Sequence, residues 1–286
     1  MESSMKKLLL SLALSLGTLS ATTVMAAAPA FSASQMSQVK IKDLSFKEVM
    51  RQFYSGRMGY ASVNDEYVES MPNIGLDSID SDGERTVALM RPVIPYKNVA
   101  GEPRYLVIIE KVQVKDGSLV SCHACTATAD LYSFKKLNNG QFQLISKTPK
   151  NVDYSSNWGR VGLNQESIQE GLQPLGKSLI GSVFMNNYMS FGTISSWWDV
   201  LHLPENDFIN LYTLGDAGAE NSGHYEEGSP LHYDYNVTFK ALPENATYYP
   251  IKLTYKGEKP TEDYDRINSV NYSKVVKFDP VKKEYK

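Results

Sequence analysis

Residues 45–54 carry apolar side chains at intervals of three and four, which is the spacing of one helical face. Ser45 precedes this face and Glu48 follows three residues later, an arrangement typical of a capped helix N-terminus. Gly56 supplies a stop signal. The pattern therefore predicts a short amphipathic helix whose apolar face consists of Phe46, Val49, Met50 and Phe53.

From residue 82 onward the apolar positions recur with period two, which predicts strands with one buried face. The Asn138-Asn139-Gly140 turn predicts a hairpin between two of these strands. Pro92 marks either an edge strand or an early strand end. The predicted strands cover residues 85–94, 104–114, 126–136, 141–147, 178–194, 232–240, 248–255 and 272–278.

The remaining segments predict a few short helices and long loops. Residues 165–172 read as a short helix, and residues 196–199 as another that begins with a capping serine. Residues 215–230 are dense in polar residues and glycine and predict a loop. We therefore expect a mainly β or α+β fold, with antiparallel sheets in one domain of two β lobes.

The domain is expected to span residues 41–286, with a lobe boundary near residues 148–175. Residues 27–40 are small and polar and predict a disordered lead-in.

Residues 1–26 have the order of a secretory signal peptide. Lys6 and Lys7 precede an apolar run over residues 8–19, and small residues follow up to a cleavage position after Ala26. The run is shorter than the roughly 20 residues that span a membrane, although an uncleaved N-terminal anchor is the alternative. The pattern predicts export to the periplasm or the extracellular space, with no membrane span in the mature chain.

Composition narrows the range of partners. The formal net charge is −3 and the chain has no basic cluster, so nucleic acid is not an expected partner. The chain contains 18 tyrosines, which suit half-buried sheet faces as well as ligand surfaces. The expected partner is therefore a small ligand or another protein.

The two cysteines of the chain lie in Cys122-His123-Ala124-Cys125. Thr126 follows the second cysteine, so covalent haem attachment is excluded. In an exported protein a structural disulfide between Cys122 and Cys125 is expected, with His123 presented at the turn. A redox-active pair and a zinc site that includes both thiolates and His123 are the alternatives.

This cysteine element resembles one in a group of uncharacterised exported bacterial proteins. The resemblance covers Ser121 to Cys125, Asp130 to Phe134, Asn139 to Leu144, and Trp158-Gly159. In that group a Cys-His-x-Cys element leads into a hairpin and then into an aromatic-glycine loop. The resemblance implies an exported setting and a β fold, and it implies neither an activity nor site residues.

Two further segments are candidates for ligand contact. The polar loop over residues 216–234 contains His224 and His232, and Trp197-Trp198 forms the other candidate surface. An exposed acidic loop and packing of both indoles into the core are the alternatives. The histidine spacing matches no helical metal motif, and no metal or other cofactor is expected.

No nucleophile elbow, Walker loop or dinucleotide fingerprint is present, and no catalytic residues are nominated. The leading hypothesis is therefore an exported, non-enzymatic protein that binds a ligand or another protein. The alternatives are an exported enzyme, either a thiol–disulfide protein or a hydrolase with a dispersed site, and a metal-binding protein that uses the cysteine element.

Overall fold

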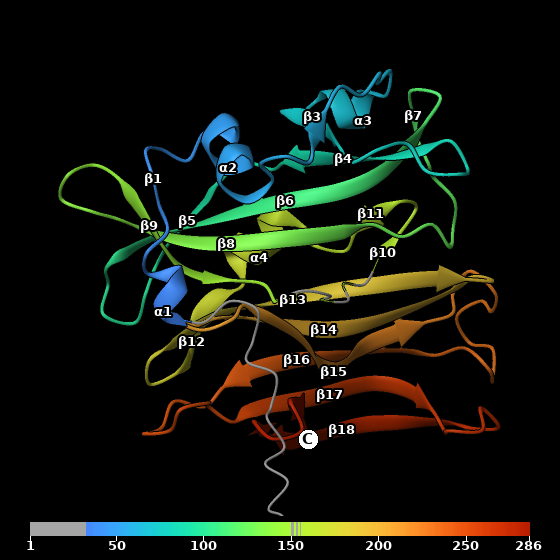
Figure 1. Ribbon diagram of the computed structural model, residues 1–286. Helices are drawn as coiled ribbons and strands as arrows, with labels where there is room; N and C mark the ends of the chain where they lie inside the picture. Colours follow the sequence, from blue (N-terminus) through green and yellow to red (C-terminus); the bar gives the residue numbers. More distant parts are fainter. Residues whose placement is uncertain (1–32, 150–151, 153, 155) are drawn as a thin grey trace, which may run out of the picture. The chain divides into compact units, whose positions relative to one another are not determined.

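The computed structural model describes residues 33–149, 152, 154 and 156–286 (Figure 1). The fold is mainly β, with antiparallel sheets and, among these residues, four short helices. This confirms the predicted fold class. The predicted signal peptide, residues 1–26, lies outside the described residues. Within the described ranges, no helix has the length and apolar character needed to cross a membrane.

The first sheet, here sheet 1, is built from residues 40–147. Its strands follow the order β1-β9-β8-β6-β4-β3-β2, and both β5 and β7 pair with β6. Because Pro92 has no N–H, the predicted strand over 85–94 divides into β4 and β5. The strands are β1 (Lys40–Ile41), β2 (Met58–Gly59), β3 (Asn73–Leu76), β4 (Glu84–Met90), β5 (Ile94–Lys97), β6 (Pro103–Lys115), β7 (Ser118–Leu119), β8 (Thr128–Lys136) and β9 (Phe142–Lys147).

The second sheet, sheet 2, is a seven-stranded meander in which every strand pairs with its neighbour in the chain (Figure 1). The helix predicted at residues 196–199 is wrong, because these residues belong to β14. The loop predicted at residues 215–230 begins only after residue 220. The strands are β12 (Leu172–Gly176), β13 (Leu179–Ser190), β14 (Thr193–Leu203), β15 (Asn210–Glu220), β16 (Asp234–Ala241), β17 (Ile251–Pro260) and β18 (Ile267–Val276).

The helices and two small ladders complete the fold. Ser45 caps α2 as predicted, because its side chain accepts a hydrogen bond from the Glu48 N–H. The expected disordered lead-in over residues 27–40 contains α1 and a fully buried Met36. The helices are α1 (Ala33–Met36), α2 (Phe46–Phe53), α3 (Glu66–Glu69) and α4 (Gln165–Glu170), and the ladders are β10 (Ser156–Asn157) with β11 (Arg160–Val161), and β19 (Phe278–Asp279) with β20 (Glu284–Tyr285).

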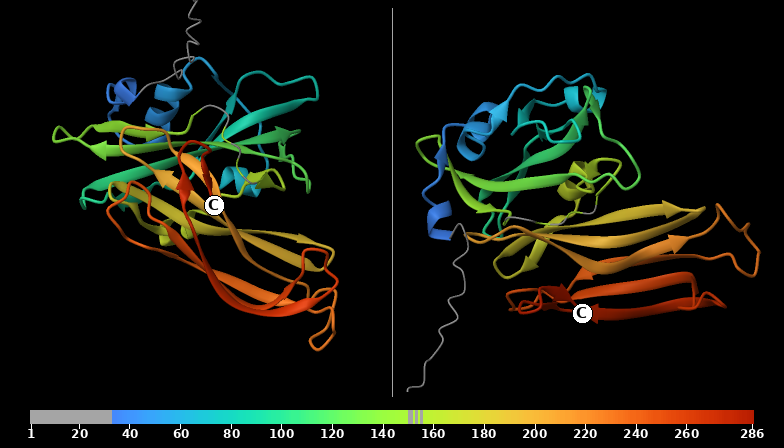
Figure 2. Two further views of the ribbon diagram at one scale, coloured as in Figure 1. Left: turned by 90° about the horizontal axis from the view of Figure 1, so that it is seen from below. Right: turned by 45° about the vertical axis from the view of Figure 1, so that its right-hand side comes forward.

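Sheets 1 and 2 share one hydrophobic core. Leu106 and Ile108 of β6 belong to the same buried cluster as Phe184 of β13 and Leu201 of β14. Helix α2 lies on the other face of sheet 1 (Figure 2). There the Phe53 ring stacks on that of Tyr132, with ring centroids 3.9 Å apart. Sheet 1 is therefore covered on both faces, and one of these covers is sheet 2.

A buried ion pair interrupts this apolar core. Glu110 of β6 is fully buried, and its carboxylate accepts hydrogen bonds from Arg91 at 2.7 and 3.0 Å. The Tyr67 hydroxyl and the Val161 N–H also donate to it, at 2.8 and 2.9 Å. Arg91 additionally donates to the Leu163 carbonyl oxygen. The carboxylate thus ties α3 and the segment after β10 to the middle of sheet 1.

A second buried polar group lies on the face of sheet 2 that points away from sheet 1. His202 of β14 is only 5% exposed, and its Nε2 is 2.7 Å from the Tyr285 hydroxyl. The rings of Tyr212, Tyr248 and Phe278 surround it, with centroids 4.9 to 5.6 Å away. The β19–β20 hairpin therefore packs against sheet 2 through a cluster of aromatic rings.

Replacing Arg91 by methionine should lower the free energy of unfolding by about 3–5 kcal/mol, because it leaves a buried carboxylate without its cation. Urea denaturation followed by circular dichroism measures the change. Arg266→Met is the control, since that guanidinium lies 3.9 Å from Asp265 and its side chain is 78% exposed. The control should change the free energy by less than about 0.5 kcal/mol. Equal effects of the two variants would contradict the assigned role of the pair.

His202 should make the fold sensitive to mild acid. Burial lowers its pKa from 6.5 to about 3, so as the pH falls the unfolded chain takes up the proton before the folded chain does. Stability is therefore lost below pH 6.5, and the His202 contribution should fall by about 2 kcal/mol between pH 7 and pH 5. Urea denaturation of the wild type and of His202→Phe at both pH values isolates this contribution. Parallel pH dependence of the two proteins would show that His202 is not buried as described.

Candidate functional site

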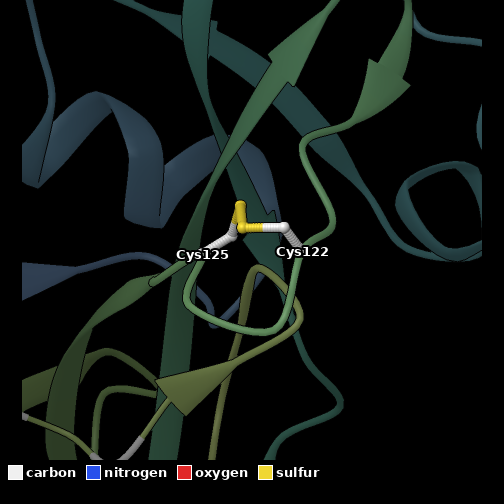
Figure 3. Close-up of a disulfide and its surroundings, with 2 residues drawn as sticks. All are labelled: Cys122 and Cys125. Carbon is white, nitrogen blue, oxygen red and sulfur yellow. A yellow bond between two sulfur atoms is a disulfide. The ribbon is translucent and has the colours of Figure 1, made fainter.

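Cys122 and Cys125 close a short turn at the start of the β8 segment (Figure 3). Their sulfur atoms are joined in a disulfide bond, and the Cys125 N–H donates to the Cys122 carbonyl oxygen at 2.9 Å. The chain then enters β8 at Thr128 without an intervening helix. The pair therefore forms a disulfide in an extended segment, with His123 exposed between the two cysteines.

This geometry bears on the two alternative uses of the cysteines. A redox cysteine commonly has a lowered pKa at a helix N-terminus, and the structure places no helix there. Zinc binds thiolates, whereas both sulfurs are here joined to each other. In the part of the chain that the structure describes, no three His, Cys, Asp or Glu side chains are grouped so that they could hold a metal ion.

His123 lies among aromatic rings from distant parts of the chain. Its ring centroid is 5.5 Å from that of Trp158, in the β10–β11 turn, and 5.1 Å from that of Tyr188, in β13. Both contacts have edge-to-face geometry, which is favourable for aromatic pairs. Three separate segments thus meet at the disulfide turn.

The exposed rings continue to the tip of the β13–β14 hairpin. Phe191 is 94% exposed at this tip, and Trp158 and Tyr188 are 52% and 41% exposed. We call His123, Trp158, Tyr188 and Phe191 the aromatic surface. Phe191 follows Tyr188 by three residues on the same hairpin. Exposed apolar side chains that form a patch commonly mark an interaction site.

Two turns of the aromatic surface share an unusual backbone conformation. Trp158-Gly159 and Phe191-Gly192 each join two strands, and all four residues have positive φ, between 47° and 74°. Hairpin turns of this kind favour asparagine or aspartate before the glycine. An aromatic residue in the left-handed region costs about 1–2 kcal/mol. Two aromatic residues therefore occupy positions that local stability alone does not favour.

The backbone of the Trp158 turn is fixed by contacts with neighbouring segments. The Gly159 N–H donates to the Cys125 carbonyl oxygen at 2.9 Å. A Cβ on Gly159 would lie 2.3 Å from the Val120 carbonyl oxygen, so only glycine fits this contact. Two residues further on, Val161 donates to the buried Glu110. Trp158 is consequently fixed between the disulfide turn and the buried ion pair.

His224 and His232 belong to the loop that follows β15. This loop contacts the Phe191 turn, because the Gly223 N–H donates to the Gly192 carbonyl oxygen at 3.1 Å. The exposed His224 ring packs edge-on against Tyr225, with centroids 4.6 Å apart. Nδ1 of the half-buried His232 is 3.1 Å from the Tyr225 carbonyl oxygen. The loop therefore borders the hairpin tip of the aromatic surface.

Trp197 and Trp198 are half-buried on opposite faces of β14, and both indole N–H groups have partners. Trp197 donates to Asp199 at 3.1 Å, and Trp198 donates to the Val237 carbonyl oxygen at 2.7 Å. Burial raises the pKa of Asp199, while hydrogen bonds from Asn186, Thr213 and Trp197 oppose this shift. The two tryptophans thus pack within sheet 2, and neither lies in the aromatic surface.

Of the residues nominated from sequence, the structure places His123 in the aromatic surface and His224 beside it. Trp158, Tyr188 and Phe191 were missed, because their proximity depends on how sheets 1 and 2 pack. The aromatic-glycine pairs Trp158-Gly159 and Phe191-Gly192 were a usable signal. Comparisons with protein-family models, with curated proteins and with solved structures found no match for this chain.

The disulfide should stabilise the fold modestly. Replacing both Cys122 and Cys125 by serine should lower the free energy of unfolding by about 2 kcal/mol, because the closed loop is very short. Denaturation of the variant, beside the wild type with and without reductant, measures the effect. The reduced wild type should match the variant. A wild type that carries free thiols when recovered from its native compartment would contradict the structural role of the pair.

Proposed function

We propose that this chain is an exported, non-enzymatic protein that binds another protein through the aromatic surface. The observation that carries the proposal is the pair of aromatic-glycine turns, which hold Trp158 and Phe191 exposed at a local cost in stability. Backbone strain of this kind concentrates at functional sites. A protein partner is favoured over a small ligand because these rings lie on turns and at a hairpin tip.

The chemistry of the surface suits a protein partner. Tryptophan, tyrosine and phenylalanine are enriched in the buried centres of protein interfaces, where a few of them supply most of the binding energy. Rigid side chains on fixed turns lose little entropy when they bind. The disulfide and the Gly159 contact supply this rigidity for Trp158 and His123.

Export rests on the predicted signal peptide, and the cysteine pair supports it. Disulfides persist in oxidising compartments and are rare in the cytosol. The partner would therefore be met in the periplasm or outside the cell.

Site-directed photo-crosslinking in the producing cells tests the proposal. A photoreactive phenylalanine analogue placed at position 191 should give a discrete adduct with one other protein. The same analogue at position 281 is the control, because Val281 is 90% exposed in the turn between β19 and β20, outside the aromatic surface. A second change, Trp158→Ala, should lower the adduct yield at position 191 by about tenfold.

Three results would contradict the proposal. Adducts of equal yield at positions 191 and 281 would indicate non-specific contact, and the absence of any adduct at position 191 would indicate that the surface is unused. An adduct of twice the mass of the chain would assign the aromatic surface to self-association.

A further inference from the structure

A separate cavity of about 240 Å³ lies beside the His202 cluster, on the face of sheet 2 that points away from sheet 1. The loop after β14 and the β19–β20 hairpin form its other walls. It is smaller than the roughly 300–1,000 Å³ of pockets that hold drug-sized ligands. Its lining includes His202, Asp207, Tyr212, Tyr248, Phe278 and Lys283.

The floor of the cavity is aromatic. The Tyr248 ring stacks on the His202 ring at an interplanar angle of 18°. The centroid of the Phe278 ring is 4.6 Å from that of Tyr248 and 4.8 Å from that of Tyr212. Such a floor accommodates an apolar or cationic group. Among the described residues, neither the Tyr212 nor the Tyr248 hydroxyl has a hydrogen-bond partner. Burial, with the nearby Tyr248 and Asp207, raises the pKa of Tyr212 to about 12, so this hydroxyl stays protonated and can donate.

The rim of the cavity carries two charges of opposite sign. The Asp207 side chain accepts a hydrogen bond from the Phe208 N–H at 2.7 Å, and it makes no ion pair with any described residue. The Lys283 ammonium group likewise makes no ion pair within the described part of the chain. An anion and a cation thus border the same aromatic floor, and neither is neutralised by a neighbouring side chain.

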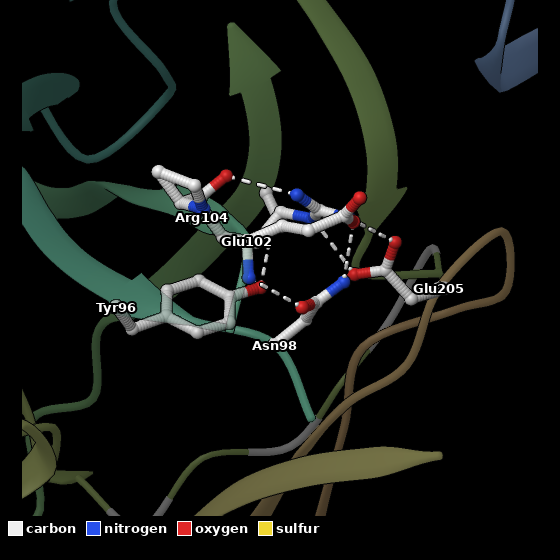
Figure 4. A network of polar contacts seen from close by, with 7 residues as sticks. Tyr96, Asn98, Glu102, Arg104 and Glu205 are labelled. Atoms are coloured by element: carbon white, nitrogen blue, oxygen red, sulfur yellow. Dashed lines mark hydrogen bonds and ion pairs between the residues drawn. The ribbon is translucent and has the colours of Figure 1, made fainter. Parts of the chain in front are cut away.

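The Asp207 wall is held in place by sheet 1. Arg104, only 4% exposed, makes two hydrogen bonds to the Glu205 carboxylate, at 2.7 and 2.8 Å (Figure 4). The Asn206 N–H donates to the Ile145 carbonyl oxygen at 2.9 Å, and the Ser146 hydroxyl donates to the Asp207 carbonyl oxygen at 2.8 Å. The wall is therefore preformed, which reduces the entropy that binding would otherwise cost.

A second wall of the cavity, which includes Lys283, is the β19–β20 hairpin. Lys277 and Lys286 exchange backbone hydrogen bonds of 2.8 and 3.0 Å at its base. A hydrogen bond between the Tyr285 hydroxyl and His202 Nε2 connects the hairpin to sheet 2. Asp207 and Lys283 thus lie on two segments, the loop after β14 and the β19–β20 hairpin, that are each bonded to the rest of the fold.

We propose that this cavity binds a small zwitterion with an apolar body, of the size and chemistry of a free α-amino acid. The ammonium group pairs with Asp207, the carboxylate pairs with Lys283, and the apolar side chain packs on the rings of Tyr248 and Phe278. Asp207 and Lys283 are both exposed to solvent. A simple cation would pair only with Asp207 and a neutral polyol with neither charge, whereas a zwitterion pairs with both. A ligand with both charges satisfies every group at the rim.

Isothermal titration calorimetry with L-phenylalanine and L-leucine tests this site. We expect at least one of them to bind with an affinity about tenfold or more above that of its analogues lacking one charge. For L-phenylalanine these analogues are phenethylamine and 3-phenylpropionate, and for L-leucine they are isopentylamine and 4-methylpentanoate. N-acetyl-L-phenylalanine amide, which lacks both charges, should not bind.

Two variants test whether Asp207 and Lys283 bind the charged groups of the amino acid. Asp207→Asn and Lys283→Met should each weaken binding of the same amino acid by about tenfold or more. Lys282→Met is the matched control, because Lys282 is the sequence neighbour of Lys283 but does not line the cavity, and it should leave the affinity unchanged. Unchanged circular dichroism spectra establish that the variants fold.

Several outcomes would overturn the proposal. The first is that neither amino acid binds at concentrations up to about 10 mM. The second is that phenethylamine binds as tightly as L-phenylalanine. The third is that Lys282→Met and Lys283→Met change the affinity for the amino acid equally. Because the aromatic surface shares no residue with this cavity, none of these results bears on the proposed protein partner.

Discussion

The Glu110 carboxylate lies in the apolar face of β6, where an ion without partners would cost several kcal/mol. The chain meets this constraint with Arg91 from the end of β4, the Tyr67 hydroxyl from α3 and the Val161 N–H from β11. These donors come from segments far apart in the sequence. The buried charge therefore dictates where they converge, and it gives the inter-sheet core a directional contact that apolar packing alone lacks.

The candidate binding surface follows from this convergence. Val161 is three residues after Trp158, and between them Gly159 bonds to Cys125 of the disulfide turn. The segment is thus attached to sheet 1 on one side and to the disulfide on the other. The His123 ring in turn contacts both Trp158 and Tyr188 of sheet 2. The segment from Trp158 to Val161 therefore links the buried core to the aromatic surface.

Local patterns in the sequence predicted the capped helix and most of the strands of six or more residues, since alternation, turn residues and caps act over a few positions. Among these longer strands, β14 and β15 were missed. The helix predicted at residues 196–199 failed because Ser196 followed by two tryptophans resembles a cap. In β14 those tryptophans instead alternate between the two faces of a strand. His123 could be nominated because it lies between the cysteines. Its contacts with Trp158 and Tyr188 could not, because they depend on the packing of the two sheets. The cavity beside His202 was missed for the same reason.

The central claim is that the buried carboxylate of Glu110 fixes the segment that presents Trp158. Amide hydrogen exchange of Val161, followed by nuclear magnetic resonance, tests it most directly. If Val161 donates to a buried carboxylate, its amide should exchange only through large-scale unfolding and show protection close to that of the central strands β6 and β8. Exchange of this amide at the rate of an exposed loop would show that the segment opens independently of the core, and would contradict the account.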